Sequence, residues 1–166
     1  MGALGELERS HEADVEATAP QQNLDDVFKD LRDESSRPGT ADQSAQHMKL
    51  AHTYLEMGLV DVAIAALKTA VRSPRQRFEA ASILGRLYRK QSEHADAVQW
   101  FERAAEAPAP NVEEGRSLMY DFGVALEETG ETARALAIFM ELQADAGDYR
   151  DVGQRVDRLA KVQTGG

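Results

Sequence analysis

The stretch LGRLYRKQSEHADAVQWFERA, residues 84–104, decides the fold of this chain. It holds two runs of helical periodicity, and each run pairs a small residue with a large one. Gly85 precedes Tyr88 in the first run, and Ala97 precedes Phe101 in the second. Because residues three or four apart share one face of a helix, the pattern predicts two antiparallel helices with closely approaching backbones.

The same pattern occurs twice more along the chain. One copy lies 34 residues earlier and the other 38 residues later. The earlier copy keeps Leu50, Ala51, Tyr54, Gly58, Ala63, Ile64, Leu67, Ala70 and Pro74, and the later copy keeps Phe122, Gly123, Leu126, Gly130, Ala135, Phe139 and Leu142. The four extra residues fit a loop over Ala107–Glu114, where two prolines disfavour helix. Since one hairpin cannot bury its own apolar face, about three stacked hairpins are needed for a continuous core.

These residues resemble the tetratricopeptide repeat (TPR) family over about residues 44–146. The resemblance implies an all-α solenoid that binds another protein, often a peptide held in a groove, and has no activity of its own. We therefore predict a TPR domain over residues 44–162, with three helix–turn–helix repeats at about 44–77, 78–111 and 116–147. A C-terminal capping helix is expected at about 148–162, with Asp148 as its N-cap and an apolar face of Tyr149, Val152, Val156 and Leu159.

Three short phrases, at residues 24–28, 54–64 and 148–152, are similar to C-terminal TPR modules of bacterial scaffold proteins. Those modules serve envelope, motility or secretion systems. The size, the acidity and the three repeats also resemble translocator chaperones of type III secretion, which gives an alternative function as a secretion chaperone.

The first helix of each repeat is expected to line the groove. The candidate partner-binding residues are Met48, His52 and Leu55 from repeat one, Ser82, Arg86, Arg89 and Lys90 from repeat two, and Tyr120, Val124 and Glu127 from repeat three. The predicted groove is apolar at one end, basic in the middle and acidic at the other end. The family's carboxylate clamp for chaperone tails is absent, because Ile83 and Asp121 stand at two of its polar or basic places.

The charge of the chain is concentrated in its first residues. Residues 1–43 hold eleven acidic and four basic side chains, a net charge of −7, whereas the whole chain has −10. Nucleic acid is therefore an unfavourable partner, because phosphate binding needs a basic face. No apolar run reaches the 18 residues of a membrane span, no leader-like segment is present, and a cytoplasmic location is the default expectation.

Within this acidic tail, which reads as mostly disordered, one segment is amphipathic. A short helix is predicted at about residues 24–34, with Leu24, Val27, Phe28 and Leu31 on one face and aspartates beside them. One interpretation is that it packs as an extra helix on repeat one. The other is that it docks in the basic middle of the groove, where it would act as an autoinhibitory segment of a regulatory subunit, or would link two chains into a dimer. A free partner with the same acidic, amphipathic character would suit the groove equally.

No pattern for catalysis, a cofactor or a metal is present. The four histidines have no metal-ligand spacing, and His47 stands where the repeat consensus has a large core aromatic. The chain has no cysteine and no glycine-rich phosphate loop. We therefore expect a protein that is not an enzyme, with no cofactor and no metal.

Overall fold

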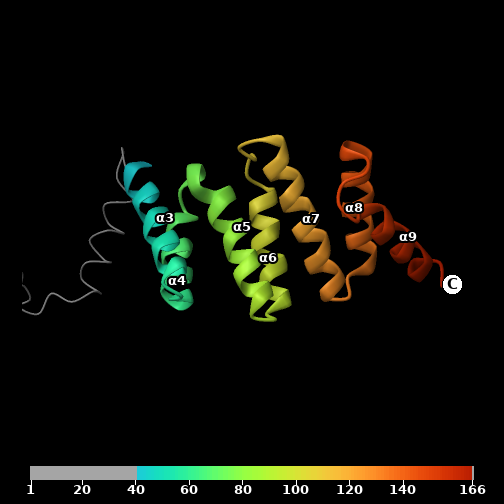
Figure 1. Ribbon diagram of the computed structural model, residues 1–166, viewed down its shortest axis with the longest axis horizontal. Helices are drawn as coiled ribbons and strands as arrows, with labels where there is room; N and C mark the ends of the chain where they lie inside the picture. Colours follow the sequence, from blue (N-terminus) through green and yellow to red (C-terminus); the bar gives the residue numbers. More distant parts are fainter. Residues whose placement is uncertain (1–40, 166) are drawn as a thin grey trace, which may run out of the picture. The chain divides into compact units, whose positions relative to one another are not determined.

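The computed structural model describes residues 41–165, which form seven α-helices joined by short connections (Figure 1). The helices are α3 (Ala41–Glu56), α4 (Val60–Ala70), α5 (Pro74–Lys90), α6 (His94–Ala105), α7 (Val112–Glu128), α8 (Thr132–Ala146) and α9 (Val152–Gln163). They make three helical hairpins followed by a single helix, as the sequence predicted. The short helix predicted at residues 24–34 lies outside the described residues.

The turn inside each hairpin has the same geometry. Gly58, Ser92 and Gly130 occupy equivalent places, with φ of 78°, 60° and 81°. In each turn the next amide N–H donates to a carbonyl five residues back, as Glu93 does to Tyr88 at 2.9 Å. Glycine adopts this left-handed conformation without the steric cost that a side chain brings. Among these three turn residues, only Ser92 therefore carries that cost.

In the second and third hairpins the two helices approach closely at a glycine, as the pattern predicted, and the ring that packs on each glycine comes from the second helix of the same hairpin. Phe101 and Phe139 are fully buried. A Cβ atom built on Gly85 would lie 2.5 Å from the ring of Phe101, and one built on Gly123 would lie 2.6 Å from the ring of Phe139. The two glycines are therefore required by the close approach of α5 to α6 and of α7 to α8.

The third hairpin begins earlier than expected. Helix α7 starts at Val112, inside the predicted loop and four residues before the predicted boundary at 116. Asn111 caps this helix, because its Oδ1 accepts from the Glu114 N–H at 2.8 Å and its Nδ2 donates to the Glu114 carboxylate at 2.8 Å. This reciprocal cap allows the helix to start directly after Pro110.

The capping helix starts later than expected. It begins at Val152, and Asp151 rather than Asp148 is its N-terminal flanking residue. The chain turns first, since Gly147 and Arg150 have φ of 66° and 45°. Val152 and Leu159 are buried in the common core, so α9 closes the last hairpin.

From α4 onward each helix packs against the next one in the chain, and the helices follow one another in a row (Figure 1). The core is continuous from Met48 to Leu159. Among the described helices, none combines the length and the apolar character that crossing a membrane requires.

Candidate functional site

The candidate site is the face formed by the first helices of the hairpins, α3, α5 and α7. Between α5 and α7 this face is hollowed by a cavity of about 430 Å³. Its lining residues are Phe78, Glu79, Ser82, Arg86, Glu114, Ser117, Leu118, Asp121 and Arg150. Six of these nine side chains come from charged or hydroxyl-bearing residues at helical spacing on α5 and α7. The cavity is therefore a polar hollow with an apolar floor of Phe78 and Leu118.

Asp121 is the carboxylate at the centre of this cavity. Its side chain is only 16% exposed and faces Arg86 across 3.7 Å. Burial raises the pKa of Asp121, while the nearby guanidinium groups of Arg86, Arg150 and Arg89 act in the opposite direction. The sequence placed Asp121 at a position of the absent carboxylate clamp but did not predict its pairing with Arg86, because the two residues lie on different hairpins.

Arg150, in the segment between α8 and α9, forms one wall of this cavity. Its guanidinium group lies over the rings of Tyr120 and Tyr149, at 4.8 and 5.1 Å from their centroids. It also donates to the Ser117 hydroxyl at 3.5 Å. The sequence did not indicate Arg150 as a site residue, since the pattern predicted that the capping helix begins at about residue 148 and that Arg150 lies within it.

The predicted basic middle of the groove is neutralised by acidic residues of α7. Arg86 pairs with Asp121, and Arg89 pairs with Glu128 at 2.7 Å. Lys90 is exposed and has no ion pair among the described residues. The face therefore presents mixed charge, in place of the basic patch that we predicted.

The predicted apolar end is smaller than expected. Met48 is buried, at 4% exposure, and Leu55 is half-buried against the core. His52 is exposed and lies 3.0 Å from the Glu79 carboxylate, which brings α3 and α5 together on this face. Met48 is therefore a core residue that offers little surface to a partner.

Ser82 lines the cavity, yet its own surface is nearly all covered. It is 4% exposed, and its hydroxyl donates to the Phe78 carbonyl at 2.7 Å. This bond within the helix uses the only hydroxyl proton of Ser82. The side chain therefore has no proton left to donate to a ligand, and it serves mainly to line the cavity.

The predicted acidic end is covered by the C-terminal segment. Tyr120 Oη donates to Asp151 at 2.6 Å, and Glu127 accepts from Arg155 at 2.7 Å and from Arg158 at 2.9 Å. Val124 is buried at 5% exposure. Val124 is therefore a core residue, and Tyr120 and Glu127 are half-buried and hold contacts from the C-terminal segment.

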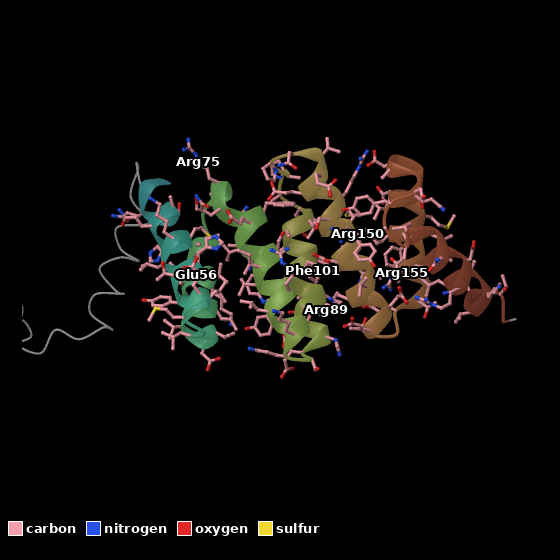
Figure 2. All side chains as sticks on the ribbon, in the orientation of Figure 1. Glu56, Arg75, Arg89, Phe101, Arg150 and Arg155 are labelled. Carbon is pink, nitrogen blue, oxygen red and sulfur yellow. The ribbon has the colours of Figure 1, made fainter. Side chains whose placement is uncertain are left out.

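Hydrogen bonds and ion pairs hold the C-terminal segment against α7. Figure 2 shows Arg150 and Arg155 beside α7 and α8. Burial acts to lower the pKa of Arg155, but hydrogen bonds with Glu127, Asp151 and Tyr120 outweigh it and raise that pKa. The hydrogen bond from Tyr120 lowers the pKa of Asp151. Arg155 and Asp151 are therefore held in their charged forms at neutral pH.

The remaining titratable residues form no reactive cluster within residues 41–165. No group of three or more histidine, aspartate or glutamate side chains there could hold a metal ion. His47 is buried, as predicted, and burial lowers its pKa. Its Nε2 atom has no hydrogen-bond partner in the described part of the chain.

Comparison with known proteins agrees with this geometry. Residues 48–113 match the model of the tetratricopeptide repeat family. The structure is similar to the N-terminal domain of stress-induced protein-1 from C. elegans, with a TM-score of 0.63, 16% identity, and coverage of 75% of this chain and all of the other. It is also similar to a putative kinesin light chain from Podospora anserina with nearly identical TPR-like repeats, with a TM-score of 0.60, 15% identity, and coverage of 96% and 88%. No curated protein sequence matches the chain. At this level of identity the two structures establish the fold.

Proposed function

We propose that this chain, whose residues 48–113 belong to the tetratricopeptide repeat family and whose fold is a TPR-type solenoid, is an adaptor that binds a segment of a partner protein between α5 and α7. TPR solenoids are protein-interaction scaffolds, and the proposal goes further by choosing the site. The observation that carries it is the open cavity lined by Arg86, Asp121 and Arg150.

The chemistry of the cavity supports a partner segment with at least one acidic group. Arg86 is half-exposed, and its nearest oxygen on Asp121 is 3.7 Å away, so this ion pair is loose. Two tyrosine rings hold the guanidinium group of Arg150 in place. A partner carboxylate could reach both guanidinium groups without first breaking a short ion pair, and bidentate arginine contacts would fix its orientation.

The N-terminal segment of residues 24–34 stays one candidate for this occupant. It lies outside the described residues, so autoinhibition and pairing of two chains through it remain predictions from the sequence. A separate partner protein is the simpler proposal.

The experiment is affinity capture from the source cell with three baits: the wild-type chain, Arg86→Glu and Arg134→Glu. Arg134 is a matched control, because it is 48% exposed against 49% for Arg86 and pairs with Glu102 of α6 on the second helices of the hairpins. We expect one partner to be retained by wild type and Arg134→Glu and lost with Arg86→Glu.

Equal recovery with Arg86→Glu, or equal loss with Arg134→Glu, would contradict binding in this cavity. The identity of the captured protein separates the two functions that the sequence allows. A folded partner supports the adaptor, whereas an otherwise insoluble, membrane-active client would support the secretion chaperone.

A further inference from the structure

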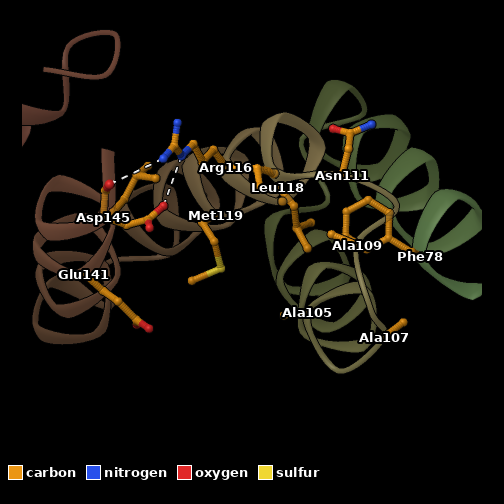
Figure 3. Close-up of a pocket in the computed structure, with 13 residues that line it drawn as sticks. Phe78, Ala105, Ala107, Ala109, Asn111, Arg116, Leu118, Met119, Glu141 and Asp145 are labelled. Carbon is orange, nitrogen blue, oxygen red and sulfur yellow. Dashed lines mark hydrogen bonds and ion pairs between the residues drawn. The ribbon is translucent and has the colours of Figure 1, made fainter. Parts of the chain in front are cut away.

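A second cavity, larger than the first, opens at the connection from α6 to α7. Its volume is about 670 Å³, and its floor is made by the buried side chains of Phe78, Leu118 and Leu142. Figure 3 shows Leu118 and Met119 between the alanines of the connection and the end of α8. The cavity lies within the size range of sites that bind ligands, about 300–1,000 Å³.

The cavity exists because the chain supplies no side chain to fill it. The α6–α7 connection spans residues 106–111, whereas the α4–α5 connection spans only residues 71–73. The cavity wall here consists of Ala105, the last residue of α6, and of Ala107 and Ala109 on the longer connection. Pro108 and Pro110, on either side of Ala109, hold the backbone out of helical conformation, so the alanines border the space without closing it.

The polar groups at this cavity indicate a partner of opposite charge. Arg116 donates to Asp145 at 3.0 Å, so these two groups satisfy each other. The Glu141 carboxylate stands apart from that pair, is exposed, and has no ion pair in the described part of the chain (Figure 3). The cavity is therefore apolar inside with an unpaired negative charge at its edge.

The surroundings reinforce this charge. Over residues 105–119 and 141–148 the chain carries six acidic residues and one basic residue. A phosphate-rich surface would be repelled, and so would a second copy of a chain with net charge −10. A cationic segment with a bulky apolar side chain complements both features.

We infer that this edge cavity is a second docking site, which takes a basic amphipathic segment of a partner protein. A large apolar side chain of the segment enters over Leu118 and Leu142, and a neighbouring lysine or arginine meets Glu141. The site is distinct from the cavity between α5 and α7, because the two cavities have only Phe78 and Leu118 in common among their lining residues. An adaptor with two such sites can hold two segments at once.

The test uses the full chain and a fluorescently labelled helical peptide, with leucines and one tryptophan on one face and lysines on the other. A second peptide has glutamate in place of every lysine. Fluorescence anisotropy measures both affinities. We expect the lysine peptide to bind and the glutamate peptide to bind at least about tenfold more weakly.

Two variants of the chain test the location. Ala109 is exposed on the loop, so Ala109→Trp places an indole ring in the cavity. We expect this variant to bind the lysine peptide at least about tenfold more weakly, because the peptide can no longer bury its large apolar side chain there. Glu141→Lys should weaken it several-fold. Asp157→Lys, an equal charge change at an exposed position on α9, should stay within about twofold of wild type.

Unchanged binding to Ala109→Trp with a wild-type circular dichroism spectrum would overturn the inference. Equal weakening by Glu141→Lys and Asp157→Lys would also overturn it, because attraction to the net charge alone would then explain the affinity. Failure of this site leaves the Arg86 experiment unaffected, since the two use different variants and different ligands.

Discussion

At the scale of single residues, the fold depends on two glycines that face two phenylalanine rings. A Cβ atom on Gly85 would meet three ring carbons of Phe101 at 2.5 to 2.8 Å. The ring is fully buried, so it has no free space to move into. This contact explains why the sequence pattern that predicts the fold begins with a glycine.

We expect Gly85→Ala to destabilise the chain by about 1–3 kcal/mol, the usual cost of overpacking a core. Urea unfolding measures the change. Gly153→Ala is the matched control, because a Cβ there would meet only the side-chain amide of Gln143 at an ordinary 3.6 Å. The control should be neutral or stabilise by up to about 1 kcal/mol. If Gly85→Ala proved as harmless as the control, close packing on Phe101 would not be the reason for the glycine.

A second prediction at this scale concerns His47 and pH. Burial lowers the pKa of His47 in the folded chain, whereas in the unfolded chain the pKa has its ordinary value of 6.5. Below pH 6.5 the unfolded chain therefore binds a proton that the folded chain does not. The stability that neutral His47 contributes is present above pH 6.5 and is lost as the pH falls toward the lowered value.

The measurement is urea unfolding at several pH values for wild type, His47→Phe and His52→Gln. Wild type should lose stability relative to His47→Phe as the pH is lowered below 6.5. His52→Gln is the control for the loss of a histidine, because His52 is exposed where His47 is buried. Parallel pH profiles for wild type and His47→Phe would show that His47 takes up its proton equally well in both states.

At the scale of elements, α9 is attached by charge as well as by apolar contact. Arg155 bonds Asp151, the residue that precedes α9, and Glu127 on α7, and its guanidinium group lies 5.4 Å from the centroid of the Tyr120 ring. Its side chain is only 20% exposed. Loss of Arg155 would therefore leave Glu127 partly buried with one partner fewer.

We expect Arg155→Ala to destabilise the chain by about 1.5–3 kcal/mol, the range for hydrogen bonds to charged groups. Hydrogen exchange should show the largest loss of protection in α9. Arg158→Ala is the control, because Arg158 bonds the same glutamate but is 57% exposed, and its pair is worth about 0–1 kcal/mol. Similar effects of both substitutions would mean that burial does not distinguish the two ion pairs.

At the scale of the whole molecule, each helix from α4 to α9 packs mainly against its neighbours along the row. Stability in such a solenoid is close to a sum of hairpins and the interfaces between adjacent hairpins. A change in one hairpin is therefore felt most by that hairpin and the next one.

We expect Gly123→Ala, which would drive a Cβ atom to 2.6 Å from the ring of Phe139, to lower hydrogen-exchange protection most in α7, α8 and α9. Helices α3 and α4 should keep more of their hydrogen-exchange protection. Gly85→Ala gives the complementary case, with the largest loss in α5 and α6. An equal loss in all seven described helices for both variants would contradict the nearest-neighbour picture and indicate one cooperative unit.

The sequence by itself determined the hairpins, their order and the residues that hold each one together. Those features depend on spacings of three, four and about thirty residues along one chain, and such spacings can be read directly. The turns at Gly58 and Gly130 and the close approach of the helices at Gly85 and Gly123 follow from them, whereas the packing of Phe101 and Phe139 on these glycines is seen only in the structure.

Only the tertiary structure decided which predicted groove residues are available to a partner. Arg89 pairs with Glu128 from 39 positions away, and Arg155 covers Glu127 from 28 positions away. These contacts depend on how one hairpin is rotated against the next, and on where α9 turns back at Gly147 and Arg150. Local periodicity predicts neither the rotation between hairpins nor the position of this turn. It shows which face of a helix is buried, but not which other helix packs on that face.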